Sequence, residues 1–343
     1  MKSPHLQSLE RLGIRLIETP TPFPQVPTAN AWLIEGPELT IIDTGSAFRP
    51  AWDAFKEQFA RTGHAIGDIR RVLITHGHPD HAGLAMAIVK RSDARVFIHE
   101  ADARKVTTVS EERFGSVWGR YETYYRLLGM PADFIEYMHQ VAFAALRPGE
   151  LLDTVEMLHD GDTFEVGAGK LEVLACPGHT PGCVCFHLPD HGVLFSGDHL
   201  LPSISPNPVM ELGAEASLEE PWEGKFRSLV TYIESLERSR AMDLDLVLPG
   251  HGDTFTDHRR LIDELNRFHQ TRQHHVLKAL RASEATVYDL ARQLFPNREH
   301  IELFLSISEM VGHLEVLEAE EKITRTLQGG RFYHRINQED VGS

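Results

Sequence analysis

The sequence predicts an α/β protein, and three observations support this fold class. The chain has 343 residues, of which 42% are apolar and 24% charged, so it can bury a sizeable core in about two domains. Short apolar runs alternate with segments of helical periodicity through residues 1–265, the first predicted domain. From residue 266 onward helices are followed by a hairpin, which predicts a second domain over residues 266–343.

Apolar periodicity and turn residues place the regular elements of residues 1–265. Apolar runs bounded by Gly or Pro predict strands, and apolar residues at helical spacing, such as Trp52, Phe55 and Phe59, predict helices. The predicted strands are 30–34, 39–42, 72–74, 95–99, 163–166, 171–174, 184–188, 193–195 and 246–248. The predicted helices are 50–62, 85–91 and 221–237.

The last part of the chain has the element order of a winged helix. Helices are predicted at 261–281, 286–294 and 301–320, and a hairpin at 322–336 turns at Gly329-Gly330. The third helix carries five glutamates and no lysine or arginine, whereas phosphate contacts need basic side chains. We therefore interpret this domain as a packing or dimerisation element, and expect that the protein can form a homodimer.

Composition also limits the partners and the compartment. The formal net charge of −16 repels polyanions, so no nucleic-acid partner is expected. No apolar stretch approaches the roughly 18 residues of a membrane-spanning helix, and the N-terminus lacks the apolar block of a secretory signal. Three cysteines are too few for a disulfide framework. We expect a cytoplasmic protein with reduced thiols, no membrane partner and a small-molecule substrate.

The stretch "LITHGHPDHAG" concentrates His76, His78, Asp80 and His81 in one loop after a predicted strand. Imidazole nitrogen and carboxylate oxygen are ligands that suit zinc, iron and manganese. His76 and His78, two positions apart, can point into one site, and Asp80 and His81 can turn toward a neighbouring one. Because one ion could not easily use all four side chains of so tight a loop, the sequence indicates a pair of metal ions.

Three further segments supply the ligands that this loop lacks. "CPGHTPG" presents His179, "LFSGDHL" presents Asp198 and "LVLPGHG" presents His251, each in a Gly-containing turn after a predicted strand. Loops at the ends of strands on one edge of a sheet converge in space, and functional groups gather there. Together with the first loop they give seven candidate ligands, enough for two sites with positions left for water and substrate.

The motifs THGHPDH, PGHTPG, SGDH and PGHG, in this order, resemble the metallo-β-lactamase superfamily over about residues 10–265. The chain as a whole resembles the glyoxalase II/LACTB2-like metallohydrolases, and its tail resembles the winged-helix extension of the lactamase-like subgroup related to endoribonuclease LACTB2. The resemblance implies an αββα metallo-β-lactamase sandwich with a helical insert at 101–148 and a C-terminal winged-helix domain. It also implies two divalent metals, with Zn²⁺ favoured and Mn²⁺ or Fe²⁺ as alternatives.

The resemblance assigns a role to each candidate ligand. It implies that His76, His78 and His179 bind the first metal, that Asp80, His81 and His251 bind the second, and that Asp198 bridges them. Asp43, in "IIDTG", matches a position that braces the metal loops, and it can equally be a turn residue before Gly45. A hydroxide that bridges the metals is the implied nucleophile. The implied catalytic residues are Asp198 and Asp80, the latter as a proton acceptor or relay.

The helical insert carries aromatic residues at helical spacing, and Gly129-Met-Pro131 divides it into two helices. One interpretation is a hairpin that packs on the sandwich. The other is a lid over the metals with an apolar acyl or aryl pocket, for which the candidate residues are Trp118, Tyr121, Tyr124 and Tyr125.

The predicted function is that of a dinuclear metal-dependent hydrolase of a small ester, thioester or lactone. Three alternatives remain open: a metal-dependent endoribonuclease, a persulfide dioxygenase with a single iron, and a non-catalytic regulator. The acidic composition disfavours the first, the complete second metal site disfavours the second, and the presence of all seven ligands disfavours the third.

Overall fold

The computed structural model describes residues 4–24, 26–107, 111–145, 151–206, 210–212, 219–220, 222 and 224–337. The chain forms two compact units. The first comprises Met1–Thr108, Pro148–Pro206 and Ser235–Ile262, and the second comprises Val109–Arg147, Asn207–Glu234 and Asp263–Ser343. None of the helices among these described residues is long and apolar enough to cross a membrane.

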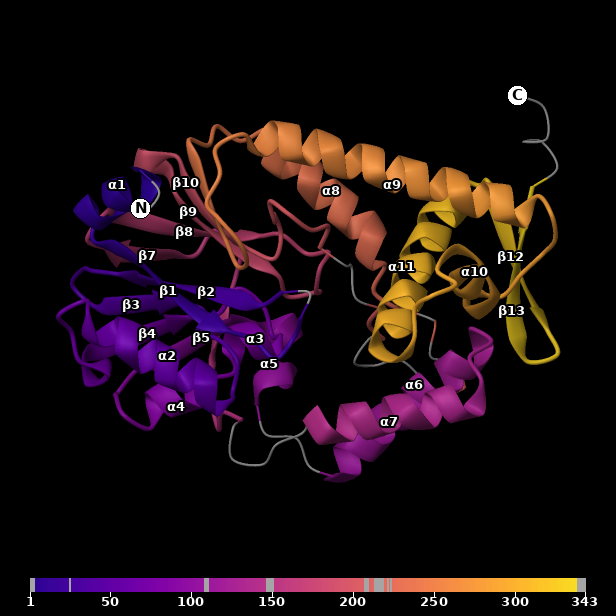
Figure 1. Ribbon diagram of the computed structural model, residues 1–343, viewed down its shortest axis with the longest axis horizontal. Helices are drawn as coiled ribbons and strands as arrows, with labels where there is room; N and C mark the ends of the chain where they lie inside the picture. The colour runs from indigo at the N-terminus through magenta and orange to yellow at the C-terminus, as the bar shows by residue number, and fades with distance from the viewer. Residues whose placement is uncertain are drawn as a thin grey trace. The chain divides into compact units, whose positions relative to one another are not determined.

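The first unit contains two β-sheets that lie face to face (Figure 1). One sheet has six strands in sequence order: β1 (Ile14–Pro20), β2 (Thr28–Ile34), β3 (Leu39–Ile42), β4 (Ile69–Leu73), β5 (Arg95–His99) and β6 (Glu156–Leu158). The strands from β3 to β6 are parallel, while β1, β2 and β3 pair antiparallel. The loops after β3 and β4 therefore leave this sheet at the same edge.

The other sheet has five strands in the order β11-β10-β9-β8-β7. They are β7 (Thr163–Val166), β8 (Gly169–Ala175), β9 (Val184–Leu188), β10 (Val193–Gly197) and β11 (Leu246–Pro249). β10 and β11 are parallel, and β9 is antiparallel to both β8 and β10. The carboxyl ends of β8, β10 and β11 therefore lie at one edge, which is where the candidate ligands follow.

Alternating side chains divide the core of the first unit into two layers. Leu33, Ile41 and Val72 pack in a cluster with Phe55 of α2 (Arg49–Ala60), whereas Trp32, Ile34, Ile42 and Leu73 face the second sheet in another cluster. This alternation follows from the two-residue period of a strand and lets one sheet be covered on both faces.

Helices close the outer faces of the first unit. The helices and short turns are α1 (Pro4–Arg11), α2 (Arg49–Ala60), Ile66–Asp68, α3 (Pro79–Ala82), α4 (Ala85–Val89), α5 (Glu100–Val106) and Pro189–His191. α2 and α4 lie on the outer face of the six-stranded sheet (Figure 1). In α8 (Ser228–Arg240), Ser235 Oγ donates to Pro177 O at 2.7 Å, which attaches the carboxyl-terminal half of this helix to the end of the second sheet.

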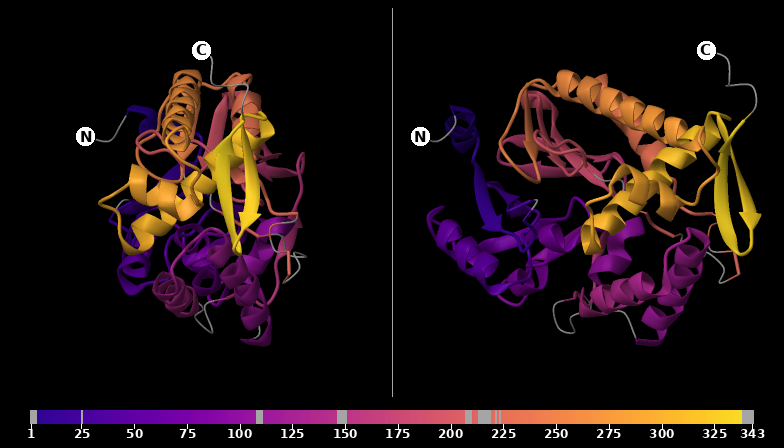
Figure 2. Two further views of the ribbon diagram at one scale, coloured as in Figure 1. Left: turned by 90° about the vertical axis from the view of Figure 1, so that its right-hand side faces the viewer. Right: turned by 45° about the vertical axis from the view of Figure 1, so that its right-hand side comes forward.

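The second unit is mainly helical. Its elements are α6 (Glu111–Leu127), α7 (Ala132–Ala145), most of α9 (His258–Leu280), α10 (Val287–Leu294), α11 (His300–Ala319), β12 (Ile323–Gln328) and β13 (Arg331–Ile336). The antiparallel β12–β13 pair lies beside α11 (Figure 2). Side chains of α6, α7, α10 and α11 share one hydrophobic core.

The α/β fold class and the sandwich with its helical insert are confirmed. The order α9, α10, α11, β12, β13 is the predicted one, but its assignment as a winged helix stays a prediction, as do the predicted domain boundaries. Helix 221–237 begins only at Ser228, and residues 221 and 223 lie outside the described ones. The insert predicted at 101–148 includes residues 108–110 and 146–148, which are also outside them.

Candidate metal centre

All seven candidate ligands follow strand ends at one edge of the sandwich. His76 and His78 lie in the loop after β4, and Asp80 and His81 lie in the short helix α3 that this loop enters. His179, Asp198 and His251 follow β8, β10 and β11, respectively. The backbones of the two sheets meet here, since Val184 N donates to Thr75 O at 2.8 Å. The structure thus brings together every ligand that the sequence predicted.

The first group consists of His76, His78 and His179. His78 Nδ1 lies 3.0 Å from His76 Nε2 and 3.0 Å from His179 Nε2. One ligand atom from each of the three residues lies within 4.8 Å of the other two. Three ring nitrogens therefore converge on one point.

The second group consists of Asp80, His81 and His251. His251 Nε2 lies 3.3 Å from His81 Nε2 and 3.5 Å from Asp80 Oδ2. All three residues are buried, and their ligand atoms also lie within 4.8 Å of one another. This group offers two nitrogens and one carboxylate oxygen.

Asp198 lies between the two groups and directs one oxygen toward each. Its Oδ2 is 3.5 Å from His179 Nε2, while its Oδ1 is 3.3 Å from His81 Nε2 and 3.5 Å from His251 Nε2. Oδ1 is buried and has no hydrogen-bond partner of good geometry among the described residues. A buried carboxylate oxygen without such a partner is costly, so this atom is suited to bind a cation.

Asp43 braces this arrangement from the loop after β3. Its Oδ1 accepts a hydrogen bond from Thr75 N, and its Oδ2 accepts one from Thr75 Oγ1, both at 2.8 Å. Oδ2 also lies 2.8 Å from His81 Nδ1. Asp43 has a φ of +57°, a left-handed conformation that aspartate adopts only at a cost. Both interpretations of Asp43 from the sequence are compatible with this geometry.

The hydrogen bonds of the rings decide which nitrogens are free. His251 Nδ1 lies 2.6 Å from Thr28 O, so it carries the proton and leaves Nε2 as an electron-pair donor. The Thr75 hydroxyl donates to Asp43, so it accepts from His76 Nδ1 at 3.1 Å and leaves His76 Nε2 free. Free nitrogens 3.0 to 3.3 Å apart repel each other unless a cation or a proton lies between them. The residues present therefore fit divalent metal ions, with donors that suit Zn²⁺, Mn²⁺ or Fe²⁺.

Burial and neighbouring charges shift the pKa values of His76 and His78 in one direction and that of His251 in the other. Burial lowers the pKa of His76 well below its usual value and that of His78 to about 3. Burial acts the same way on His251, but the charge of Asp198 overcomes it and raises the pKa of His251 to about 10. His76 and His78 are thus neutral, which is the form that binds a metal, whereas a metal at the second group would displace a proton from His251 Nε2.

Sequence reasoning missed the glycines that allow the ligands to approach one another. A Cβ on Gly250 would lie 2.6 Å from Asp198 Oδ1 and 2.7 Å from His81 Cε1. A Cβ on Gly197 would lie 2.7 Å from the Thr75 side chain. The only sign of this constraint in the sequence is that Gly250 directly precedes His251 and Gly197 directly precedes Asp198.

The candidate substrate-pocket residues belong to α6 in the second unit. Tyr124 and Tyr125 are 2% and 4% exposed in the core of that unit. Trp118 and Tyr121 are partly buried at its margin, and Tyr121 Oη accepts a hydrogen bond from Leu212 N at 3.3 Å. Packing thus accounts for Tyr124 and Tyr125, and a substrate pocket made by these residues stays a prediction.

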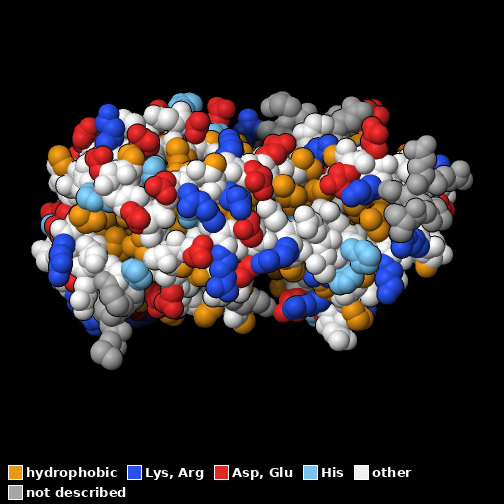
Figure 3. All heavy atoms as spheres, turned by 90° about the horizontal axis from the view of Figure 1, so that it is seen from above, with side chains coloured by type: hydrophobic (Ala, Val, Ile, Leu, Met, Phe, Trp, Pro, Cys, Tyr) orange, Lys and Arg blue, Asp and Glu red, His pale blue; other side chains and the backbone are white. Residues whose placement is uncertain are grey.

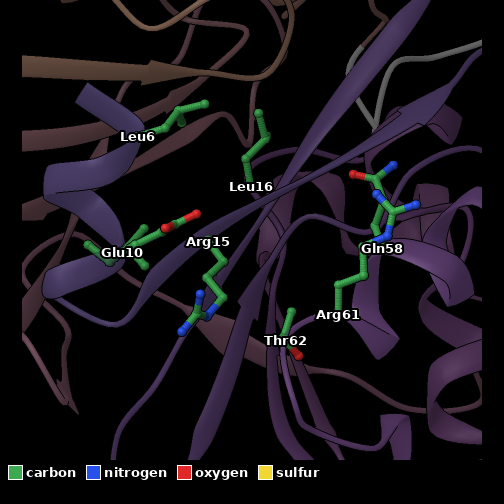
Figure 4. Close-up of a pocket in the computed structure, with 8 residues that line it drawn as sticks. Leu6, Glu10, Arg15, Leu16, Gln58, Arg61 and Thr62 are labelled. Atoms are coloured by element: carbon green, nitrogen blue, oxygen red, sulfur yellow. The ribbon is translucent and has the colours of Figure 1, made fainter. Parts of the chain in front are cut away.

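A separate cavity of about 210 Å³ lies on the first unit (Figure 4). Its lining residues come from α1, β1, α2 and the turn after α2, and include Arg15, Gln58 and Arg61. The seven candidate ligands lie in other loops, so this cavity is distinct from the metal centre.

Comparison of the sequence with known proteins gives one family. The profile of the metallo-beta-lactamase superfamily matches residues 25–251. A probable metallo-hydrolase of Bacillus subtilis (strain 168), YqjP, is 32% identical over 325 residues, which cover 93% of this chain and 96% of that protein. The acyl-coenzyme A thioesterase MBLAC2 of Bos taurus is 27% identical over 239 residues, covering 66% of this chain and 74% of that protein.

Solved structures with the same fold cover nearly the whole chain. The metallo-beta-lactamase family protein TTHA1429 from Thermus thermophilus has a TM-score of 0.77 and 27% identity, over 95% of this chain and 99% of that chain. A beta-lactamase domain protein from Burkholderia ambifaria has a TM-score of 0.78 and 26% identity, over 95% and 92% of the two chains. The likeness therefore extends through both units.

Proposed function

Because the chain belongs to the metallo-β-lactamase superfamily, we propose that it is a dinuclear metal-dependent hydrolase of a small ester, thioester or lactone. The observation that carries this proposal is the place of Asp198, which directs Oδ1 toward His81 and His251 and Oδ2 toward His179. A carboxylate in this position can hold two cations side by side, and a site for one ion would not need it.

Each group of side chains has a role in this proposal. His76, His78 and His179 would hold one divalent ion, and Asp80, His81 and His251 would hold the other, with Asp198 shared. When bound, such a pair activates a water molecule near neutral pH and polarises the oxygen of the group under attack. Asp43 keeps the proton of His81 on Nδ1, so that Nε2 faces the centre.

The hydrolysis itself then needs only one proton transfer by the protein. A water oxygen forms a bond to the carbonyl carbon, and the bond from that carbon to the alcohol oxygen or thiol sulfur breaks. The proton lost by the water goes to the leaving group. Asp80 is the proposed carrier, because it supplies a carboxylate within the second group, with Oδ2 3.5 Å from His251 Nε2.

The choice of carbonyl substrates rests on two supports. One relative, MBLAC2, is an acyl-coenzyme A thioesterase. The net charge of −16 disfavours a long polyanion, and on the face in Figure 3 lysines and arginines lie in small groups among acidic side chains. These points favour a hydrolase of esters, thioesters or lactones over the endoribonuclease.

A substrate panel tests the proposal. Protein loaded with Zn²⁺ or Mn²⁺ is assayed on short acyl esters, acyl thioesters, lactones, a phosphodiester and single-stranded RNA. We expect hydrolysis of at least one carbonyl class, loss of that activity in Asp198→Ala, and wild-type activity in His275→Ala, which changes an exposed histidine of α9. Cleavage of RNA alone, abolished by His76→Ala, would replace this proposal with the endoribonuclease.

A further inference from the structure

A third buried carboxylate lies beside the candidate ligands without belonging to either group. Asp102 is in α5, the helix that follows β5, and its exposed fraction is 0%. A buried charge is costly unless it is paired and fully hydrogen-bonded, so the hydrogen-bond partners of Asp102 indicate its role.

The partners of Asp102 are the loops that carry the first group. Its Oδ2 accepts hydrogen bonds from Gly77 N and from Thr180 Oγ1, both at 2.7 Å. Its Oδ1 accepts one from Gly182 N at 3.1 Å. Gly77 lies between His76 and His78, and Thr180 follows His179 directly. One carboxylate thus joins two loops that are about a hundred residues apart in the sequence.

The close approach of Asp102 requires glycine at two of these positions. A Cβ on Gly182 would lie 2.7 Å from both Cβ and Cγ of Asp102. A Cβ on Gly77 would lie 2.8 Å from the Lys105 side chain and 3.1 Å from Asp102 O. The glycines of HGH and PGC therefore fit α5 against both loops.

Lys105 completes the surroundings of the carboxylate. Its Nζ lies 2.9 Å from Asp102 Oδ1, one helical turn along α5. Burial alone would raise the pKa of Asp102, but Lys105 and the hydrogen bonds from Gly77 and Thr180 lower it, which keeps the carboxylate charged. The other partners of Asp102 each lie within three residues of a candidate ligand; they are Gly77, Thr180 and Gly182.

We propose that Asp102 is a positioning residue that holds the loops of His76, His78 and His179 in one metal-binding arrangement. This inference rests on the proposed metal centre and deepens it. Asp43 orients the second group by its contact with the His81 ring. Asp102 orients the first group by accepting a hydrogen bond from the backbone amide of Gly77. Its hydrogen bonds fix the Gly77 peptide, so that the two histidines on either side point to the same centre.

The test separates the two metal sites. A His251→Ala background leaves the first group complete, and a His179→Ala background leaves the second group complete. In each background the affinity for Zn²⁺ is measured by competition with a chromophoric chelator, with and without Asp102→Asn or Asp102→Ala. The visible spectrum of the Co²⁺-loaded proteins reports the coordination of the remaining ion.

We expect Asp102→Ala to weaken Zn²⁺ binding by the first group about 10- to 100-fold, with a smaller loss for Asp102→Asn. Binding by the second group should not change. Thr180→Val, which removes one donor to Asp102, should weaken the first group by a smaller factor. Its matched control is Thr40→Val, because Thr40 is also fully buried in the first unit and bonds a charged side chain, Arg71.

The outcomes are distinguishable. Wild-type affinity of the first group in both Asp102 variants would overturn the inference and leave the metal centre standing. In a second outcome, both groups bind Zn²⁺ more weakly by the same factor, and the metal-free variants also melt at a lower temperature. This result would show that Asp102 only stabilises the fold, and it would also overturn the inference. Wild-type protein that binds no metal would refute the metal centre itself.

Discussion

At the scale of single residues, the centre depends on which ring nitrogen of each histidine carries a proton. Asp43 holds a left-handed backbone at φ +57° and uses both carboxylate oxygens, on Thr75 and on His81 Nδ1. An ionised carboxylate only accepts hydrogen bonds, so the proton of His81 stays on Nδ1. The strained backbone of Asp43 thus holds its carboxylate where it keeps His81 Nε2 free to face the centre.

Asp43→Asn tests this coupling, since asparagine also adopts the left-handed backbone. Its amide can still accept from Thr75 N, but the NH₂ group then faces His81 Nδ1 and moves the proton to Nε2. We predict that metal affinity of the second group falls about 10- to 100-fold. Chelator competition in the His179→Ala background measures it. An unchanged affinity would show that Asp43 only forms a turn.

Gly250→Ala tests the close packing of the ligands. The new Cβ would lie 2.6 Å from Asp198 Oδ1, so the Asp198 carboxylate must move. We predict fewer than two ions per chain after dialysis, measured by elemental analysis. Gly115→Ala is the control, because nothing lies within 4 Å of its Cβ and alanine favours the helix α6 by up to about 1 kcal/mol. Two ions in both variants would contradict the prediction.

The sequence was sufficient to predict the seven side chains that the structure brings together, but not the buried carboxylate of Asp102 beside them. His76, His78, Asp80 and His81 are conspicuous because metal-binding residue types crowd one strand-end loop. Asp102 gives no such signal, since its partners in the loops lie 25, 78 and 80 residues away and two of them are backbone amides. A backbone donor has no signature in the sequence.

At the scale of elements, the strands with buried apolar runs were predictable and the polar ones were not. β10 and β11 are buried along their whole length, and their runs of apolar residues predict the ends of these strands to within two residues. β1 was missed because it is an edge strand with exposed or half-buried Arg15 and Glu18. β6 was missed because it has three residues, two of them exposed. Short and edge strands lack the periodicity on which the prediction depends.

The helical unit contains a buried ion pair. Lys225 Nζ lies 2.5 Å from Glu315 Oε1, and their side chains are 5% and 11% exposed. Burial raises the pKa of Glu315, although Lys225 opposes this shift. The folded state therefore binds a proton at Glu315 more readily than the unfolded state, and this contribution to stability falls as pH rises above the usual carboxyl pKa.

Lys225→Met removes the partner of that carboxylate. We predict that the free energy of unfolding of the second unit falls by about 3–5 kcal/mol at neutral pH, because a buried charge is left unpaired. The loss should be smaller at about pH 5 than at about pH 8, since protonation of Glu315 removes the charge. Denaturant titrations at the two pH values measure it. Lys225→Met with Glu315→Leu should recover most of the loss, and an equal loss at both pH values would contradict this account.

At the scale of the whole molecule, the candidate metal centre joins elements of both sheets in the first unit. His76, His78, Asp80 and His81 follow β4 of one sheet, while His179, Asp198 and His251 follow strands of the other. These side chains from both sheets can meet only in the folded sandwich, so a metal bound by them would stabilise that fold.

Removal of metal should therefore lower the stability of the first unit selectively. An ion at a thousand times its dissociation constant stabilises the folded state by about 4 kcal/mol. We predict that a chelator lowers the melting temperature of the calorimetric transition that contains the first unit, and that added Zn²⁺ restores it. The Asp198→Ala variant should respond less. Identical melting curves with and without chelator would contradict the prediction.

Anomalous diffraction from crystals of the metal-loaded protein tests the central claim most directly. We predict two ions about 3.5–4 Å apart. One ion should lie among His76, His78 and His179, the other among Asp80, His81 and His251, with one oxygen of Asp198 on each. A single ion at full occupancy, or ions bound away from these seven side chains, would contradict the account.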